Sequence, residues 1–504
     1  MKKKIFAALL AALMLAPTFT ACSEGGVDET DAQTAETENT TPSAEEETAA
    51  EETVDEDSRT SISDDLPEKD FEGQSFRVLT TEGGAIYGFD YTSEIIAEEL
   101  NGDACNDAVY NRNLGIETRF DVSISCQTNA TPASYIGTLV QSGTDEFDLV
   151  GMYNFLAYNA LNAQAVLNWL EVPYVNLEKP WHNQLANDSA TINNRLYAIC
   201  SDLAITSMLY THAFFFNGTL IEQYGYTADD MYTLVKEGKW TLDKAMEITS
   251  PIYEDVDGNG TRDDTDVYGF GYSIWNAADV WLAAFDQPIC TTSDTGVEMA
   301  FMTDKTVSIV EKLCNWHYNT TCFHEYPNIY EEETRMRDGT LVFAPIRFKA
   351  AFDALRDMED PYCIIPYPKW DESQEQYLTN ADDKFTVFSV PLTAVNNTEF
   401  IGIIYEALCA ESYKTVYPTY YDTALKGKYS SDPTTAEMID LVMSGRNFDF
   451  SFQFAESCFR QVPYFVRQCL QSNDPNIASK YAAIEKALGK SIEKTLYPIY
   501  GLEG

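Results

Sequence analysis

The stretches SFRVLTT (75–81) and FDLVG (147–151) decide the fold class of this 504-residue chain. SFRVLTT alternates, contains β-branched side chains and runs into Glu82, Gly83 and Gly84, which is typical of a strand that enters a loop. FDLVG is a short apolar run of the kind that parallel sheets bury on both faces. Both stretches therefore predict β-strands.

Helical and strand patterns alternate between these two stretches. We expect a helix at 94–113, interrupted near Asn101 and Gly102, then a strand in ETRFDVSIS (117–125) and a helix at 133–142. Strand, helix, strand, helix, strand is the order of an α/β fold. A second such series consists of a helix at 242–249, a strand at 266–272, a helix at 304–317 and strands at 340–345 and 362–366, before a mostly helical part from Thr398.

The length of the chain predicts at least two lobes, because single cores stop growing beyond ~250 to 300 residues. The chain carries 33 Lys and Arg against 80 Asp and Glu, a formal net charge of -47. Such an acidic chain repels nucleic acid phosphates and anionic lipid surfaces, since both bind clustered Lys and Arg. We therefore expect no nucleic acid partner.

Residues 1–22, MKKKIFAALLAALMLAPTFTAC, follow the plan of a secretory signal peptide, with three lysines, an apolar run and small residues. The apolar run at 5–16 is too short to span ~30 Å of hydrocarbon, which needs ~20 residues. The ending FTAC (19–22) resembles the bacterial lipoprotein signal, in which the cysteine is acylated and becomes the new N-terminus. This resemblance implies a lipid anchor at Cys22 on the extracellular face of the bacterial cell membrane; the alternative is an ordinary secreted protein.

Residues 23–65 hold 16 acidic side chains, one basic side chain (Arg59) and no aromatic residue. Such a segment cannot bury enough apolar surface to offset its chain entropy, so we expect a disordered acidic linker. Repulsion between its charges extends it beyond the ~36 Å of a random coil of this length. The linker would hold the folded part clear of the membrane.

Several phrases in the rest of the chain match one family in their order and spacing. DDMYTLVKEGKWTLDKAMEIT (229–249), preceded by FFFNGTLIEQYG (214–225) and followed by VYGFGYS (267–273), resembles extracellular solute-binding proteins of family 1. These are the maltose-binding-protein-like receptors of bacterial ABC importers. The other matching phrases are ELNGDACNDAVYNRN (99–113), PWHNQL (180–185), RDGTLVFAPIR (337–347), IIPYPKWDE (364–372) and ALKGKYSSDPTTAEMIDLVMSGR (424–446).

The resemblance implies a two-lobed, periplasmic-binding-protein-like fold of type II, with α/β lobes joined by crossing hinge strands. We place the first lobe at 66–210 and 391–445, and the second at 211–390 and 446–504. It also implies a monomeric receptor that binds a carbohydrate between its lobes without chemistry. Such a receptor delivers its ligand to the permease subunits of an ABC transporter and contacts the membrane only through its lipid anchor.

Candidate ligand-binding residues follow the predicted strands, because ligands of open α/β lobes lie outside the carboxyl ends of the strands. A sugar presents apolar faces that stack on aromatic rings, and hydroxyl groups that pair with polar side chains. The candidates are Glu82, Met152, Tyr153, Asn154, Tyr210 at the predicted crossover, Trp275, Asn276, Arg347 and Phe348. Met152 stands where the family often has a Trp, which argues against long malto-oligosaccharides.

Residues 255–266, DVDGNGTRDDTD, follow the D-x-D-x-N-G spacing of a calcium loop. Oxygen ligands at alternating positions of a tight loop converge on one hard cation, and Gly260 allows the sharp turn. The candidate ligands are Asp255, Asp257, Asn259, Thr261, Asp263 and Asp266. Asp266 stands where an EF-hand has Glu, so we expect weaker binding. The alternative is a solvated acidic turn without a metal.

Ten cysteines follow Cys22, and their spacing is not that of a small disulfide framework. The sequence does not assign pairs, and buried thiols are one alternative. Cys314, His317, Cys322 and His324 have a spacing similar to that of zinc ligands. Because the first two lie on a predicted helix, packing or a Cys314–Cys322 disulfide is favoured over zinc.

Enzyme motifs are absent from the sequence: it has no nucleophile elbow, P-loop, H-E-x-x-H or G-x-G-x-x-G after a strand. The resemblance to solute-binding proteins, which implies binding without chemistry, leads us to expect a protein that is not an enzyme. A glycosidase pair of carboxylates stays open, since its separation is a property of the fold. The alternatives are a binding protein for a peptide or other polar solute, a surface-anchored glycan-degrading enzyme, and a structural adhesin without a cleft.

Overall fold

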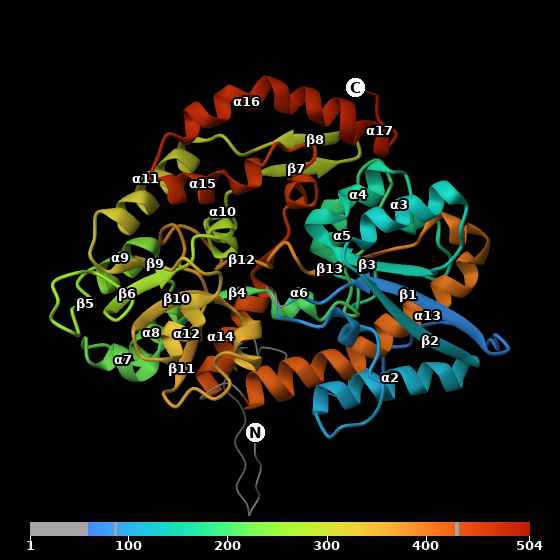
Figure 1. The fold of residues 1–504 in the computed structure, drawn as a ribbon, viewed down its shortest axis with the longest axis horizontal. Coiled ribbons are helices and arrows are strands. Elements are labelled where there is room, and N and C mark those ends of the chain that lie inside the picture. The colour runs from blue at the N-terminus through green and yellow to red at the C-terminus, as the bar shows by residue number, and fades with distance from the viewer. Residues whose placement is uncertain (1–58, 85–87, 429–432, 504) are drawn as a thin grey trace, which may run out of the picture. The chain divides into compact units, whose positions relative to one another are not determined.

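The structure is a computed structural model that describes residues 59–84, 88–428 and 433–503. The predicted signal peptide with Cys22 and most of the predicted linker lie outside the described residues. The described residues belong to one compact unit, which is a mixed α/β fold of two lobes (Figure 1). No helix in the described part of the chain is long and apolar enough to cross a membrane.

The first lobe is built on a four-stranded sheet in the order β13-β3-β1-β2. β1 runs parallel to both β2 and β3, in agreement with the alternation of strands and helices in the sequence. Helix α3 packs on β3, and α2 packs on β2 and on α13. The elements are β1 (Gln74–Thr81), α2 (Ala104–Phe120), β2 (Val122–Asn129), α3 (Pro132–Ser142), β3 (Leu149–Tyr153), β13 (Thr386–Ser389) and α13 (Thr398–Glu411).

Strand β13 runs antiparallel to β3, with Thr386 opposite Tyr153 and Ser389 opposite Val150. The sequence placed residues up to 390 in the second lobe. The pairing differs from that boundary, because hydrogen bonds across the sheet make β13 part of the first lobe.

The second lobe is built on a sheet in the order β11-β4-β10-β6-β5, with β9 also paired to β6. β10 and β9 run parallel to β6, whereas β4 is antiparallel to β10 and β11. The elements are β4 (His212–Asn217), α8 (Ala228–Lys236), α9 (Leu242–Thr249), β5 (Tyr253–Glu254), β6 (Val267–Tyr272), α11 (Asp304–Tyr318), β9 (Phe323–Glu325), α12 (Glu331–Arg337), β10 (Leu341–Arg347) and β11 (Tyr362–Ile365). Helix α14 (Pro433–Ser444) packs on β11, although the sequence placed it in the first lobe.

The predicted helix at 94–113 and strand at 117–125 are both wrong at their boundaries. Helix α2 begins only after Asp103, whose side chain accepts hydrogen bonds from the backbone N–H groups of Cys105 and Asn106. It continues to Phe120, and Asp121 ends it in the left-handed conformation at φ 48°. The helix therefore takes the first half of ETRFDVSIS, and β2 takes the second half.

The last residues of the predicted linker are ordered. The guanidinium of Arg119 forms an ion pair with Asp64, and Lys179 forms one with Asp65 at 2.6 Å. Arg59 lies over the ring of Tyr413 at 5.2 Å. Residues 59–65 thus pack on the first lobe and do not belong to a disordered linker, because their charges meet complementary partners there.

The chain passes from the first lobe to the second through α6 (Thr206–Leu209) and returns through β12 (Thr379–Asn380) into β13. Glu94 ties these two crossings together. Its carboxylate accepts hydrogen bonds from the backbone N and hydroxyl of Thr206 at 2.7 and 2.6 Å, and from the hydroxyl of Thr386 at 2.5 Å. Glu94 is only 2% exposed, so these hydrogen bonds between the two crossings lie inside the protein.

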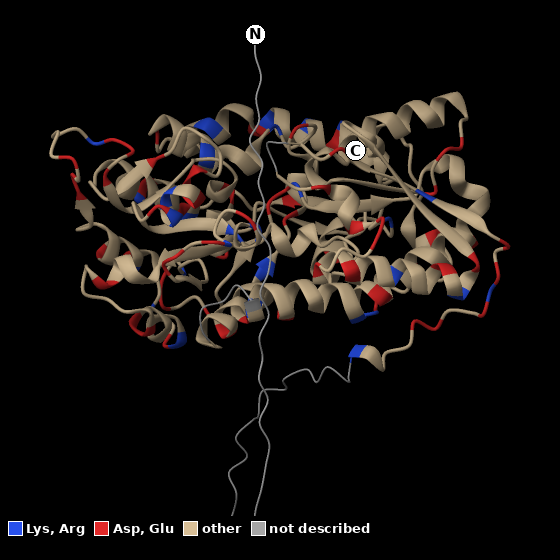
Figure 2. Ribbon diagram, turned by 60° about the horizontal axis from the view of Figure 1, so that its bottom comes forward, with Lys and Arg blue, Asp and Glu red and all other residues tan. Residues whose placement is uncertain are grey.

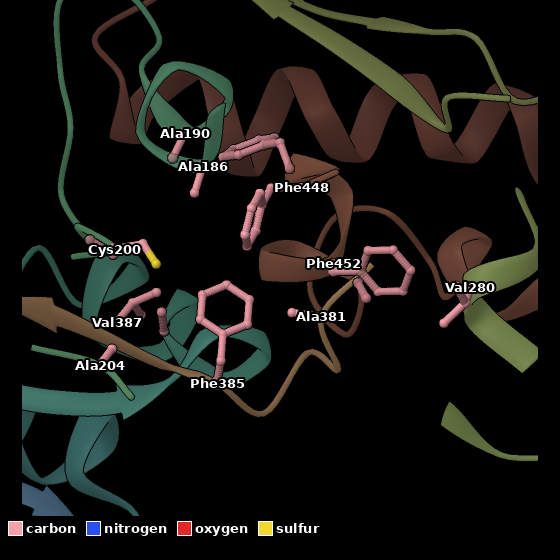
Figure 3. Close-up of a cluster of buried hydrophobic side chains, with 14 of the residues drawn as sticks. Ala186, Ala190, Cys200, Ala204, Val280, Ala381, Phe385, Val387, Phe448 and Phe452 are labelled. Carbon is pink, nitrogen blue, oxygen red and sulfur yellow. The ribbon is translucent and has the colours of Figure 1, made fainter. Parts of the chain in front are cut away.

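An apolar cluster lies next to the second crossing (Figure 3). The ring of Phe385 meets the ring of Phe448 edge-on, with centroids 5.7 Å apart. Ala381 and Cys200 lie beside these rings. The crossing strand is therefore fixed by apolar packing on one side.

The C-terminal part of the chain contacts both lobes. Helix α15 packs on α11 of the second lobe, whereas the residues after α17 contact the first lobe, where Asn193 Nδ2 donates to the carbonyl of Tyr500 at 2.8 Å. The remaining helices and strands are α4 (Tyr158–Asn162), α5 (Gln184–Ala190), α7 (Gly218–Glu222), α10 (Trp281–Ala284), β7 (Cys290–Ser293), β8 (Gly296–Met299), β14 (Arg446–Asn447), α15 (Phe465–Ser472), α16 (Ile477–Ser491) and α17 (Tyr497–Ile499). Asp and Glu residues are spread over helices and loops of the folded unit, with Lys and Arg residues interspersed (Figure 2).

Candidate ligand-binding cleft

Residues of both lobes meet where the crossing segment 380–385 passes the second sheet. The carboxyl ends of β6, β9 and β10 share one edge of that sheet, since β6 runs parallel to both β9 and β10. Asn276, just after β6, donates from Nδ2 to Asp382 at 2.6 Å. Lys384 lies 5.6 Å from the ring of Phe155 in the first lobe. This is the place where a two-lobed α/β protein holds a ligand.

Three predicted residues, Met152, Tyr153 and Asn154, lie at the end of β3. Met152 and Tyr153 line a cavity of about 90 Å³ with residues from the start of α3. The ring of Tyr153 stacks on Phe155 at 5.8 Å. Asn154 accepts a hydrogen bond from Gln453 Nε2 at 3.2 Å. The end of β3 therefore presents aromatic and amide groups.

Two other predicted residues, Glu82 and Phe348, offer no side chain to a ligand, although Phe348 belongs to the same buried cluster as Tyr153 and Tyr210. Glu82 is exposed on the loop after β1, where its backbone N donates to Asn129 at 2.9 Å. Phe348 is fully buried in an apolar cluster. The structure thus brings together only part of the predicted set.

Tyr210 and Arg347 do meet, and Tyr91 connects them to Tyr153. The guanidinium of Arg347 lies 5.0 Å from the ring centroid of Tyr210 and 3.6 Å from that of Tyr330. The hydroxyls of Tyr91 and Tyr210 share a hydrogen bond of 2.8 Å, and the ring of Tyr91 meets that of Tyr153 at 5.1 Å. A continuous aromatic row therefore joins the two lobes.

Asp382 is the centre of the buried charges. It accepts hydrogen bonds from the backbone N and Nζ of Lys384, both at 3.1 Å. Burial alone would raise the pKa of Asp382, but the positive charges of Lys384 and Arg347 outweigh it and lower that pKa. Asp382 therefore stays ionised and fixes the amide of Asn276.

Trp275 is 41% exposed, and charged and aromatic groups back its ring. The guanidinium of Arg467 lies 4.6 Å from the Trp275 ring and 4.2 Å from that of Tyr464. Arg467 forms an ion pair with Asp279 at 3.2 Å, and the Tyr464 hydroxyl donates to Asp383 at 2.7 Å. These contacts hold the ring of Trp275 in position, so that it presents an aromatic surface on which a ligand can stack.

Carboxyl groups near the cleft titrate close to neutrality. Burial raises the pKa of Asp279 to about 8, that of Glu332 to about 8 and that of Glu333 to about 7. Glu332 accepts a hydrogen bond from the backbone N of Ser273 at 3.1 Å. These carboxyls therefore take up a proton more readily than exposed ones, while Arg467 and Arg347 favour the charged forms of Asp279 and Glu333.

Sequence reasoning missed most of the charged residues of the cleft. Those residues are Asp279, Glu332, Asp382, Asp383, Lys384 and Arg467. One signal was available, because Asp-Asp-Lys at 382–384 directly precedes a buried strand and charges in such a place need partners. No such sequence signal marks Arg467 within its helix, because the role of Arg467 depends on contacts with distant segments of the chain.

The acidic loop at 255–266 folds so that its oxygens converge. One carboxylate oxygen each of Asp255, Asp257 and Asp266 lie within 4.8 Å of one another. Asp266 is fully buried, whereas Asn259 Nδ2 donates to Asp257 at 2.8 Å and to Asp263 at 3.0 Å. The donor set is all oxygen and fits a hard cation. Thr261 follows Asn259 and donates from its backbone N to the Asn259 side chain.

The described residues with zinc-like spacing do not form a zinc site. His317 Nδ1 lies 2.7 Å from the carbonyl of Leu313, and its Nε2 lies 2.8 Å from the Tyr272 hydroxyl. The ring nitrogens are therefore both occupied. Cys314 and Cys322 are buried thiols, so they do not form the disulfide that the sequence left open.

Comparisons with known proteins identify the fold. No family model matches the sequence, and no curated protein matches it. A similar solved structure is an ABC transporter solute-binding protein from Thermotoga lettingae bound with alpha-D-tagatose, at 13% identity and a TM-score of 0.51, covering 83% of this chain and 100% of that one. A family 1 extracellular solute-binding protein from Bifidobacterium longum subsp. infantis is similar at 11% identity and a TM-score of 0.51, covering 82% and 100%.

These likenesses define the class of the fold. The chain has the two-lobed α/β architecture of ABC transporter solute-binding proteins, as the sequence predicted.

Proposed function

We propose that this protein is an extracellular solute-binding protein that captures a carbohydrate between its lobes and delivers it to the permease subunits of an ABC importer. The observation that carries the proposal is the exposed ring of Trp275, which Arg467 backs and which directly precedes Asn276, the residue that donates to the buried carboxylate of Asp382 on the crossing segment. A sugar needs both an aromatic surface and hydrogen-bonding groups. The tagatose-bound relative has the same fold.

The test is a thermal-shift screen of the protein against mono- and oligosaccharides, with product analysis for every sugar that raises Tm. A ligand at 100 times its Kd adds ~2.7 kcal/mol, and Trp275→Ala should remove most of that gain because it removes the stacking surface. Leu114→Ala, at an exposed position of α2, serves as the matched control and should keep it. Cleaved sugar would mean a glycan-degrading enzyme, and a panel without shifts would favour a peptide or another polar solute.

We also propose that Cys22 is lipidated, that the protein is a monomer held on the extracellular face of the cell membrane by this anchor, and that no other part of it contacts the membrane. The lysine-rich start, the apolar run and the small residues before Cys22 support this. Lipid labelling should disappear in Cys22→Ala. Unchanged lipid labelling would contradict the proposed anchor at Cys22, but it would not bear on the proposed ligand-binding cleft.

Finally, we propose that the loop at 255–266 binds a calcium ion with a structural role. The convergence of Asp255, Asp257 and Asp266 supports it. Bound calcium would neutralise their mutual repulsion and brace the loop that leads into β6.

A further inference from the structure

The second lobe buries several polar atoms that have no hydrogen-bond partner in the described part of the chain. They are Nε and Nη1 of Arg347, both ring nitrogens of His212 and the hydroxyl of Tyr330. Arg347 and His212 are each 2% exposed. Leaving such atoms unsatisfied is costly, so a partner from outside the chain is expected.

These atoms lie close together. His212 and Arg347 are direct partners on the antiparallel strands β4 and β10, so their side chains leave the same face of the sheet. The guanidinium lies over the rings of Tyr330 and Tyr210. Nη2 of Arg347 lies 3.6 Å from Glu333, so Nε and Nη1 are the guanidinium nitrogens that remain for a ligand.

Tyr330 is held in an uncommon backbone conformation. Its φ of 67° lies in the left-handed region, which bulky residues rarely adopt and which recurs at ligand-binding positions. In this conformation its ring covers Arg347 while its hydroxyl stays without a partner. The left-handed conformation of Tyr330 thus accompanies the contact of its ring with Arg347.

The charges around these unpartnered atoms indicate which kind of ligand group can bind to them. Glu333 lies 3.6 Å from Arg347, and ionised Asp382 also acts on this guanidinium, so the positive charge of Arg347 is already balanced within the protein and needs no anionic ligand group. An ammonium group would meet the guanidinium. Nε and Nη1 lie on different edges of the guanidinium, so one carboxylate cannot bridge both. Hydroxyl groups donate and accept, and they suit Arg347, Tyr330 and a neutral His212 together.

We infer that His212, Arg347 and Tyr330 form a buried subsite for the hydroxyl groups of an uncharged sugar. This deepens the proposed function and rests on it. We expect uronic acids and amino sugars of the same ring to bind more weakly, because the charged groups of the site already balance one another.

The first experiment needs no ligand. Tyr330→Phe removes a hydroxyl that has no protein partner, so Tm of the unliganded full chain should stay unchanged or rise. The matched control is Tyr367→Phe in the same lobe, where the hydroxyl donates to the carbonyl of Ala277 at 3.1 Å. Its Tm should fall by roughly 1 to 3 °C. An equal fall in Tyr330→Phe would overturn the subsite, because it would show a structural hydrogen bond.

The second experiment is calorimetry with two matched series: D-glucose, D-glucuronate and D-glucosamine, and D-galactose, D-galacturonate and D-galactosamine. We expect a neutral sugar to bind at least tenfold more tightly than its charged counterparts. Tyr330→Phe should weaken that binding about tenfold, and Tyr367→Phe should not.

The outcomes separate the inference from the proposed function. A uronate or amino sugar that binds as tightly as its neutral counterpart overturns the subsite chemistry while the receptor function stands. If no sugar in a broad panel binds, the carbohydrate function fails, and with it the neutral-sugar assignment, whatever the stability result.

Discussion

At the scale of single residues, the acidic loop makes a prediction about calcium. Calcium should raise the Tm of the wild-type protein, and Asp257→Ala should abolish both the rise and the heat of calcium binding, because it removes one of three converging carboxylates. Asp188→Ala, at an exposed carboxylate in α5, should behave like wild type. Equal heats of calcium binding in wild type and Asp257→Ala would contradict the proposed calcium site.

Glu94, which ties the two crossings, makes a prediction about pH. Burial raises its pKa from 4.5 to about 7, so between these values the folded state keeps a proton that the unfolded state has lost. The free energy of unfolding therefore falls as pH rises through this window. Glu94→Gln has no such proton, so its Tm relative to wild type should increase from about pH 4.5 to pH 7 and then level off.

The control for this prediction is Glu99→Gln, at an exposed carboxylate. Its Tm relative to wild type should show no trend over the same range. If Glu94→Gln also shows no trend, the buried carboxylate does not titrate in this window.

At the scale of elements, close packing of α13 makes Gly402 irreplaceable. A Cβ at this position would clash with the backbone carbonyl of Pro173, which cannot move as a flexible side chain would. Gly402→Ala should therefore lower the free energy of unfolding by roughly 1 to 3 kcal/mol, measured by urea denaturation.

Gly489 in α16 is the matched control. A Cβ there meets nothing within 4 Å, and Ala is favoured over Gly inside a helix by ~0.5 to 1 kcal/mol. Gly489→Ala should raise the free energy of unfolding. A stable Gly402→Ala variant would mean that α13 and the loop at 172–173 are further apart than described.

Elements with local signals were predictable from the sequence. Periodicity predicted β1, α3 and α11 within one residue at each end, because their residues face one core. It failed at β13, since a strand added from far along the chain leaves no local mark of its partner. The cleft shows the same limit: the sequence indicated Tyr210, Trp275 and Arg347 by position, whereas the role of Arg467 depends on packing between distant segments.

At the scale of the whole molecule, the cysteines make a prediction about redox state. The ten that follow Cys22 carry thiols in the described chain, and eight of them are buried. Burial raises the pKa of Cys200 and Cys458 to about 12, so they are poor nucleophiles in the folded state. A thiol reagent should titrate about ten groups after unfolding, with and without prior reduction, and few before it.

A control for exposure is Cys126→Ser, because Cys126 is among the two partly exposed thiols. It should lower the count in the native protein by at most one. Additional thiols that appear only after reduction would show that disulfides form.

The antiparallel strand β13 has a consequence for biosynthesis. The first sheet lacks an edge strand until Ser389 has been made, and α2 lacks the partner helix α13 until Glu411 has been made. Translation at ~5 to 20 residues per second leaves tens of seconds between β3 and this closure. The emerging N-terminal half thus cannot complete its core early, and it stays incompletely folded during most of its synthesis.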